Sequence, residues 1–414
     1  MPVRIVTALA ALLAALLVFA GAAAAAPVSG PGWQSVWATA TQLPNMSFAP
    51  NWAQEGFANQ SVRQVIRVSS GGSVLRLRLS NSYGTQPLEV TGATLARTDK
   101  GVSVRPDSLR PLTIGANQTF RIAAGTEAVT DPIVLPVAPL DSLTVTLYFA
   151  QPTGPATYHA QALGTSFRGT GDHRADIAGD GFTETSESSY YLAAVETLDV
   201  LPHRSGVALF GDSITDGAAS TVDAHHTYPD ELAEQLASQG QSRPILNLGI
   251  GGNRVTVDSA WLGDSALSRF HRDVLGQPGV GTVAILEGIN DIGLSGGGIP
   301  MGAPFPVVSA DQLIAGQRTL IAEARAAGLR VIGATILPFA GSQYYDADKE
   351  AVRTAVNSWI RGSGEFDAVV DLEAALADPA DPKRLAPGLD SGDHLHPGDA
   401  GYAVMANAVR GALD

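Results

Sequence analysis

A serine between two glycines marks the first segment in which chemistry is expected. Residues 211–217 read GDSITDG and directly follow the apolar run 207–210. Glycines on both sides of a serine allow a tight turn after a buried strand and leave the hydroxyl uncovered at the edge of the sheet. A serine hydroxyl is a weak nucleophile and needs a base within hydrogen-bond reach. Ser213 is therefore the candidate nucleophile.

A candidate base lies near the far end of the chain, where residues 393–397 read DHLHP. We expect His396, just before the last predicted helix, to face the carboxyl end of the first strand. Asp393 precedes it by three residues, a spacing that on a turn lets the carboxylate reach imidazole Nδ1, set the tautomer and stabilise the imidazolium. We expect His394 to point elsewhere, as a solvated or supporting residue.

Acyl transfer also requires hydrogen-bond donors for the developing oxyanion. Residues 247–253 read NLGIGGN, and residues 288–291 read GIND. We expect the first segment to present the backbone N–H of Gly252, or alternatively of Gly251, and the second to present the side-chain amide of Asn290. Three nearby carboxylates are expected to hold loops by hydrogen bonds rather than to transfer protons: Asp212, Asp216 and Asp291.

Taken in this order, the four segments resemble the four blocks of the SGNH (GDSL-type) hydrolase family. Ser213, Gly252, Asn290 and His396 correspond to the residues that name the family, and Asp393 corresponds to the third member of its triad. The resemblance implies a carboxylic ester hydrolase, a serine esterase in which the histidine acts as base and then as acid. It implies an oxyanion hole built from the serine N–H, the glycine N–H and the asparagine amide, and it implies no cofactor and no metal.

The elements that must position these residues follow from the apolar pattern after about residue 203. Short strand-like runs alternate with helical stretches, which predicts an α/β fold with a three-layer, doubly wound, parallel five-stranded sheet. In such a sheet the active site lies at the carboxyl ends of the strands. We predict a catalytic domain over residues 203–414. The expected strands are 207–210, 245–248, 283–286, 331–337 and 368–372, and the expected helices are 228–238, 260–275, 311–327, 349–361 and 399–412.

Residues 31–200 have a different pattern, in which apolar and polar residues alternate in short runs such as 74–79 and 143–149. This pattern predicts an all-β sandwich or jelly-roll accessory domain. Residues 74–84 resemble the β-domain that precedes the catalytic domain in secreted bacterial members of the family, which are often grouped with acetylxylan-type esterases. His159 in this part is expected at the surface or at an interface, with the border of the active-site cleft as the alternative.

The N-terminus predicts export. Arg4 is the only charge before residue 27, residues 5–20 are apolar apart from one threonine, and residues 22–26 are alanines. This pattern is typical of a signal peptide over residues 1–26. An uncleaved membrane anchor is the alternative, because about 20 apolar residues can span a bilayer. We expect a secreted protein, extracellular or periplasmic, without a stable membrane anchor after cleavage.

Composition narrows the partners further. The chain has no cysteine, which excludes disulfides, cysteine-ligated metals and a cysteine nucleophile. The formal net charge of −14 argues against nucleic acid as a partner. His225 and His226 are adjacent but have no third ligand at a metal-binding spacing, so no metal site is expected. The oligomeric state is left open by the sequence.

These observations predict a secreted serine esterase that hydrolyses short-chain acyl esters, acetyl first, on small molecules or polysaccharide. One alternative is a lipase, lysophospholipase or thioesterase that acts on longer acyl chains with the same residues. Another alternative is a carbohydrate-binding or adhesion protein with a vestigial hydrolase domain. The presence of all the catalytic positions argues against this alternative.

Overall fold

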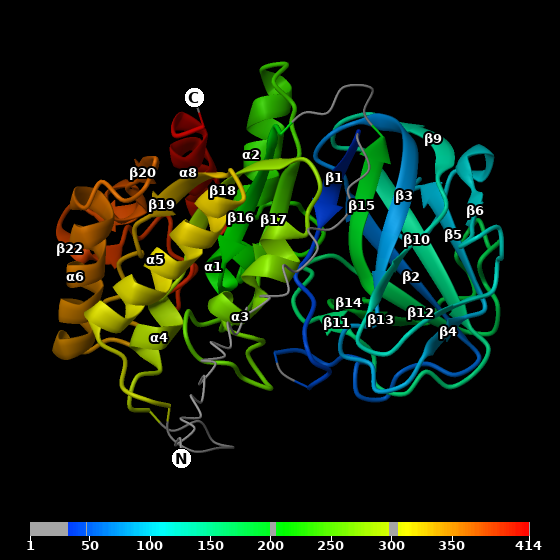
Figure 1. The fold of residues 1–414 in the computed structure, drawn as a ribbon, viewed down its shortest axis with the longest axis horizontal. Coiled ribbons are helices and arrows are strands. Elements are labelled where there is room, and N and C mark those ends of the chain that lie inside the picture. The colour runs from blue at the N-terminus through cyan, green and yellow to red at the C-terminus, as the bar shows by residue number, and fades with distance from the viewer. Residues whose placement is uncertain (1–31, 47, 199–203, 298–304, 414) are drawn as a thin grey trace, which may run out of the picture.

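The computed structural model describes residues 32–46, 48–198, 204–297 and 305–413. Antiparallel strands make up the described residues from 33 to 198, which we call the β-region, and alternating strands and helices make up the part from residue 206 onward, the α/β-region. The two regions lie side by side (Figure 1). The expected signal peptide and the expected domain boundary near residues 200–203 lie outside the described residues. Among the described residues, no helix has the length and apolar character needed to cross a membrane.

The α/β-region is built on five parallel strands in the order β17-β16-β18-β19-β20, which confirms the predicted parallel sheet. Strand β16, which lies between β17 and β18, is buried along its whole length, as expected for an apolar strand that is covered on both faces. The strands are β16 (Gly206–Gly211), β17 (Ile245–Gly249), β18 (Val280–Leu286), β19 (Arg330–Ala334) and β20 (Ala368–Val370).

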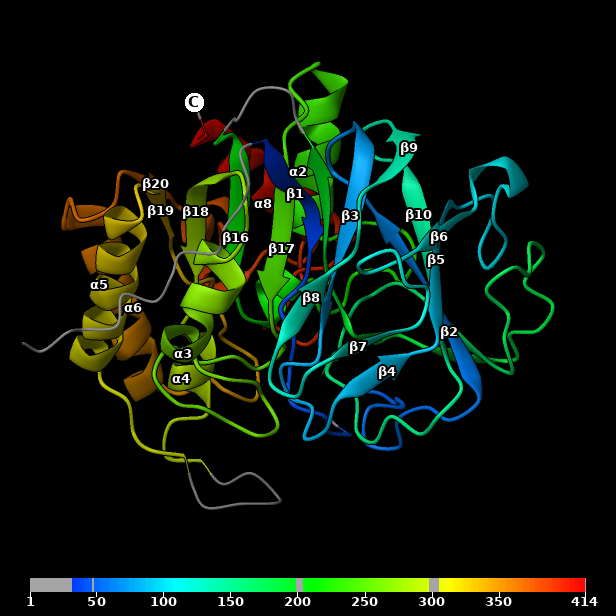
Figure 2. The same ribbon diagram turned by 45° about the vertical axis from the view of Figure 1, so that its right-hand side comes forward.

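Helices cover both faces of this sheet, which gives the predicted three layers (Figures 1 and 2). On one face α2 (Tyr228–Ser238) packs against α8 (Asp399–Gly411). On the other face α5 (Ala310–Ala326) packs against α6 (Ala347–Gly362) and α3 (Ala266–Phe270), which continues into the π-helical turn η2 (His271–Leu275). Shorter elements are α1 (Ser213–Asp216), α4 (Ile289–Gly293), α7 (Leu372–Leu376), β21 (Ala377–Asp378) and β22 (Asp381–Leu385).

Several predicted element boundaries in this region are wrong, and side-chain hydrogen bonds explain two of them. The helix expected from residue 260 begins only at Ala266, because the side chain of Ser265 accepts a hydrogen bond from the N–H of Ser268 and so caps the helix there. The strand expected to run to residue 337 ends at Ala334. Beyond it, the side chain of Asn357 bonds both the N–H and the carbonyl of Ile336, where strand pairing would otherwise continue.

The β-region consists of two antiparallel sheets that share one apolar core, as in a sandwich. Inward residues of β3, such as Leu75 and Leu77, belong to the same core as Val145 and Leu147 of β10. One sheet contains β1 (Trp33–Ala38), β15 (Leu192–Leu198), β3 (Gly72–Ser80), β8 (Glu127–Val129) and β9 (Ile133–Val137). The other contains β13 (Glu184–Ser186), β12 (Ser166–Thr170), β2 (Gln60–Arg67), β10 (Ser142–Phe149), β5 (Gly92–Arg97) and β6 (Arg110–Leu112).

Smaller elements complete the β-region. They are the 3₁₀ turn η1 (Pro106–Ser108) and the strand pairs of β4 (Leu88–Val90) with β7 (Phe120–Ile122) and of β11 (Tyr158–His159) with β14 (Ser189–Tyr190).

The two regions are joined by direct polar contacts along the edge of the parallel sheet. The N–H of Ile245 in β17 donates to Ser69 Oγ of the β-region at 2.8 Å. Arg67 at the end of β2 forms ion pairs with Asp230 and Glu234 of α2, at 3.2 and 2.5 Å. Because backbone and charged groups are both paired across the junction, the β-region is packed directly against the α/β-region.

Candidate active site

The predicted nucleophile lies at the first residue of α1, directly after strand β16. Two glycines make this turn possible. A Cβ on Gly211 would lie 2.4 Å from the carbonyl oxygen of Leu286 in the neighbouring strand, which no side chain tolerates. Gly217 ends α1 with a φ of 109°, a left-handed conformation that favours glycine. The turn therefore brings Ser213 to the carboxyl end of the sheet.

The structure brings the predicted base and its carboxylate to this serine. Ser213 Oγ lies 2.8 Å from His396 Nε2, and His396 Nδ1 lies 2.6 Å from Asp393 Oδ2. Asp393 Oδ1 also accepts the backbone N–H groups of Leu395 and His396, each at 2.8 Å. Partial burial acts to raise the pKa of the Asp393 carboxyl, but the hydrogen bonds from His396 and these N–H groups outweigh it and hold the pKa well below its usual range. Asp393 therefore stays ionised beside His396.

The neighbouring histidine belongs to a separate pair. His394 has a φ of 63° and its Nδ1 lies 2.6 Å from Asp390 Oδ2. Its side chain is 44% exposed. The left-handed turn at His394 separates it from His396, so the structure brings only His396 to the serine.

The loop after β17 that contains Gly251 and Gly252, called the glycine loop below, distinguishes between the two candidate N–H donors. Gly251 donates its N–H to Asp216 Oδ2 at 3.1 Å. Gly252 has a φ of 75°, and within the described parts of the chain its N–H has no hydrogen-bond acceptor. Of the two glycines, Gly252 is thus the one with an N–H available to a ligand.

The predicted asparagine is buried and its amide is held in one orientation. Asn290 lies in the first turn of α4, after β18. Its Nδ2 donates to the backbone oxygen of Asn253 at 3.0 Å, and its Oδ1 accepts from the hydroxyl of Tyr344 at 3.3 Å. An amide nitrogen carries two hydrogens. One therefore remains for a ligand.

Arg269 of α3 is a site-supporting residue that the sequence reading missed. Its guanidinium is fully buried and donates to the carbonyl oxygens of Gly211 and Leu248, both at 2.8 Å. It also donates to Asn253 Oδ1 at 2.8 Å. Arg269 thereby connects the ends of β16 and β17 to the loop that carries Gly252. The sequence pattern that could have identified it is an arginine three residues after Ala266, on the same buried face of the helix.

Three buried carboxylates, Asp212, Glu287 and Asp291, lie in the segments that follow β16 and β18. Glu287 lies 3.3 Å from the guanidinium of Arg269, and burial raises the pKa of Glu287 and of Asp212. Asp212 Oδ1 accepts the N–H of Ile214 at 3.0 Å. Burial also raises the pKa of Asp291 to about 6, and its Oδ2 accepts a backbone N–H at 2.8 Å. The bonds of Asp212 and Asp291 hold the turn after β16 and the loop after β17, which is the loop-holding role predicted for these two residues.

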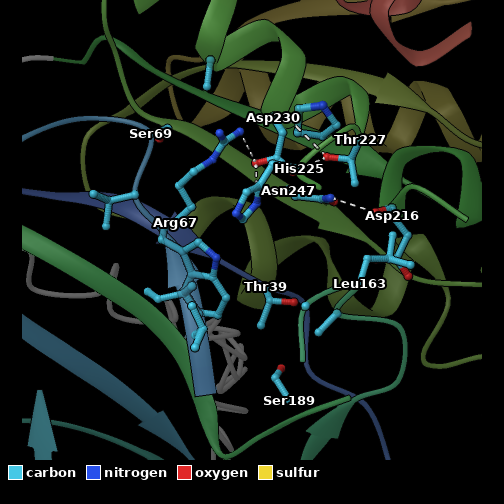
Figure 3. Close-up of a pocket in the computed structure, with 18 of the residues that line it drawn as sticks. Thr39, Arg67, Ser69, Leu163, Ser189, Asp216, His225, Thr227, Asp230 and Asn247 are labelled. Atoms are coloured by element: carbon cyan, nitrogen blue, oxygen red, sulfur yellow. Dashed lines mark hydrogen bonds and ion pairs between the residues drawn. The ribbon is translucent and has the colours of Figure 1, made fainter. Parts of the chain in front are cut away.

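A polar pocket between the two regions lies apart from Ser213 (Figure 3). His225 faces Asp230 there, with Nδ1 and Oδ1 3.9 Å apart, and His226 Nδ1 lies 2.7 Å from Glu231 Oε1. Each histidine thus has its own carboxylate partner. The described residues contain no group of three or more histidine, aspartate or glutamate side chains arranged to hold a metal ion.

Comparison with known proteins places these motifs in a family. Residues 209–404 match the family model of the GDSL-like lipase/acylhydrolase family. No curated protein matches the chain.

Three similar solved structures each cover about half of this chain. Axe2, an acetylxylan esterase from Geobacillus stearothermophilus, is 23% identical over 51% of this chain and 96% of its own, with a TM-score of 0.40. LAE5, an alpha/beta hydrolase enzyme from the metagenome of Lake Arreo, Spain, is 25% identical over 52% and 98%, with a TM-score of 0.40. A GDSL-like lipase from Bacteroides thetaiotaomicron is 18% identical over 51% and 88%, with a TM-score of 0.37. By the family match, the α/β-region is an SGNH (GDSL-type) hydrolase domain, and the protein is a carboxylic ester hydrolase.

Proposed function

We propose that the protein is a secreted serine esterase that hydrolyses short-chain acyl esters through an acyl-enzyme. The observation that carries this proposal is the chain of hydrogen bonds from Ser213 Oγ to His396 at 2.8 Å and from His396 to Asp393 at 2.6 Å. An imidazole held by an ionised carboxylate can accept the proton of a serine hydroxyl, which makes the oxygen a nucleophile.

The proposed reaction uses each of these groups in turn. Ser213 Oγ attacks the acyl carbon while His396 Nε2 takes its proton. The negative charge on the carbonyl oxygen is stabilised by the backbone N–H groups of Ser213 and Gly252 and by the remaining amide hydrogen of Asn290. His396 then gives the proton to the departing alcohol and leaves an acyl group on Ser213. A water molecule, deprotonated by His396, then attacks the acyl carbon, and His396 returns that proton to Ser213 Oγ as the acid departs.

Acetyl esters, on small molecules or polysaccharide, are the proposed substrates. The side chains of His396 and Asp393 are 17% and 48% exposed, so the loop that carries them lies at the protein surface. A site at the surface can admit a bulky alcohol such as a sugar of a polymer. The resemblance of residues 74–84 to the β-domain of acetylxylan-type esterases supports the same substrates. Export is proposed from the signal-peptide pattern of residues 1–26.

One observation favours longer acyl chains as a second candidate. Leu43, Met46 and Phe48 are large apolar side chains that are exposed. The ring of Phe48 lies against Gly251, since a Cβ built there would be 3.1 Å from Phe48 Cζ. An apolar surface beside the loop that carries Gly252 could hold an alkyl chain.

Hydrolysis of p-nitrophenyl esters from acetate to palmitate tests the proposal and separates the two candidates. We expect wild type to cleave acetate fastest, and Ser213→Ala to lower kcat by roughly 10⁴- to 10⁶-fold, as loss of a triad serine does elsewhere. Ser238→Ala, which removes an exposed serine of α2, is the matched control and should keep full activity. Rates that increase with chain length would support the second candidate. Equal inactivity of all proteins on every ester would contradict the proposed function.

A further inference from the structure

A buried histidine of the β-region reaches the α/β-region beside the candidate active site. His159 Nε2 lies 3.0 Å from Asp216 Oδ1, and its Nδ1 lies 2.8 Å from the backbone oxygen of Ala40. The side chains of His159 and Asp216 are each 3% exposed. The contact joins strand β11 to the last residue of α1, three residues after Ser213.

Both ring nitrogens of His159 face groups that accept hydrogen bonds. A carbonyl oxygen can only accept, so Nδ1 carries a proton, and a carboxylate accepts, so Nε2 carries one too. Burial alone would lower the pKa of His159, but the charge and hydrogen bond of Asp216 and the hydrogen bonds to backbone groups outweigh it and raise the pKa. The two acceptors and the raised pKa both favour the imidazolium form of His159.

Asp216 connects this pair to the loop that carries Gly252. Its Oδ2 accepts the N–H of Gly251 at 3.1 Å. Its backbone oxygen accepts from Asn247 Nδ2 at 3.0 Å, the bond drawn between these two residues in Figure 3. Asn247 and Gly251 lie on either side of the turn out of β17. The peptide that follows Gly251 contains the N–H of Gly252, so Asp216 holds the residue directly before that N–H.

Two more side chains of the β-region pack on the same glycine. A Cβ built on Gly251 would lie 2.2 Å from Gln161 Oε1 and 3.1 Å from Phe48 Cζ. Gly251 is thus held from two sides. Asp216 accepts its N–H, and side chains of the β-region pack against its Cα.

We propose that His159 is a positioning residue through which the β-region fixes the orientation of the glycine loop, which carries the Gly252 N–H. The imidazolium holds Asp216, Asp216 holds the N–H of Gly251, and the next N–H, that of Gly252, is thereby directed at the acyl oxygen. This inference rests on the proposed function. Removing the imidazolium would leave Asp216 as a buried carboxylate without its cation, a costly state that is relieved when Asp216 takes up a proton or when the loop moves. Either response weakens the hydrogen bond from the N–H of Gly251 to Asp216. The β-region is then part of the catalytic unit rather than an appended module.

The experiment compares three variants of the full chain with wild type on p-nitrophenyl acetate, with thermal unfolding measured for each. His159→Leu removes both donors, while His159→Gln keeps an amide donor near the position of Nε2. Arg67→Gln is the matched control, since Arg67 pairs with Asp230 across the same junction (Figure 3) and does not bond the glycine loop.

A lost oxyanion donor costs about 10²- to 10³-fold in kcat, so a misdirected one should cost roughly 10- to 100-fold. We expect His159→Leu to lose kcat in that range with KM nearly unchanged, and His159→Gln to recover part of it. Arg67→Gln should lower Tm and leave kcat intact.

A folded His159→Leu protein with the kcat of wild type would overturn the inference, and so would an equal loss of kcat in Arg67→Gln. If His159→Leu does not fold, Asp216→Asn decides. The new amide would present its own N–H either to His159 or to the N–H of Gly251, where an acceptor is needed. A reduced kcat therefore supports the inference, and an unchanged kcat overturns it. An inactive wild type, or an active Ser213→Ala, would instead contradict the proposed function itself.

Discussion

Two histidine–aspartate pairs in this protein use the same chemical groups in opposite surroundings. His396 and Asp393 lie 2.6 Å apart on a loop open to solvent, whereas His159 and Asp216 lie 3.0 Å apart and are buried where the two regions meet. His396 presents its second nitrogen to the hydroxyl of Ser213, which can give up a proton. His159 presents its second nitrogen to a carbonyl oxygen, which cannot.

The difference shows that the partner of the second nitrogen decides what such a pair can do. Next to a hydroxyl, the proton can move, and the pair suits acid–base chemistry. Between two acceptors, the proton is fixed and the pair becomes a structural ion pair. The four predictions below test this contrast, beginning with the largest expected effect.

Replacing the exposed carboxylate should have the largest effect. Asp393→Asn cannot accept the Nδ1 proton in the same way, so His396 would take the wrong tautomer, and we expect kcat to fall by about 10⁴-fold on p-nitrophenyl acetate. Asp390→Asn is the control, because Asp390 pairs with His394 on the same loop. If both variants lose activity equally, the contrast between the two histidines on this loop is wrong.

Removing the proposed side-chain donor of the oxyanion hole should have the next largest effect. We expect Asn290→Ala to lower kcat by about 10²- to 10³-fold with a small change in KM, because the lost hydrogen bond is stronger in the transition state than in the ground state. Asn407→Ala, at an exposed position of α8, should behave as wild type. A change confined to KM would assign Asn290 to substrate binding instead.

A hydrogen bond within the α/β-region also holds the proposed oxyanion hole, and removing this bond should have a smaller effect. Tyr344 donates to Asn290 Oδ1 at 3.3 Å. A single hydrogen bond contributes about 0.5–1.5 kcal/mol, so Tyr344→Phe should lower kcat by roughly 2- to 10-fold. Tyr345→Phe, whose ring packs on Phe339, is the control. A loss larger than that of His159→Leu would mean that the brace from the β-region is the weaker of the two.

The buried pair should also affect how stability depends on pH. Folding raises the pKa of His159 above the value of about 6.5 for an unfolded histidine, so the native state binds the extra proton. The resulting stabilisation is fully present below about pH 6.5 and is lost as pH rises through the raised pKa. Urea unfolding across this range should show the free energy of unfolding of wild type falling relative to that of His159→Leu. Buried Asp212 contributes a slope of the same sign to both proteins, which cancels in the difference. A difference independent of pH would show that His159 is neutral in the folded protein.

Much of the architecture followed from patterns that are local in the chain. Apolar runs that alternate with helical stretches predicted the parallel sheet, and the sheet order places the ends of β16, β17 and β18 side by side. The segments with Ser213, Gly252 and Asn290 follow these three strands, so their convergence was predictable. The last helix then determines where His396 arrives. Element ends were less predictable, because a cap such as Ser265 competes with a continuing helical pattern.

The sequence by itself determined the order of the motifs, the class of the fold and the residue types for acyl transfer. Only the tertiary structure decided that His159 meets Asp216, that Arg269 connects two strand ends, and that Tyr344 holds Asn290. The physical reason is that periodicity reports which face of an element is buried, whereas a buried polar group takes its partner from whatever distant segment packs there. His159 and Asp216 are 57 residues apart in the sequence and lie in different regions of the molecule, so no local pattern connects them.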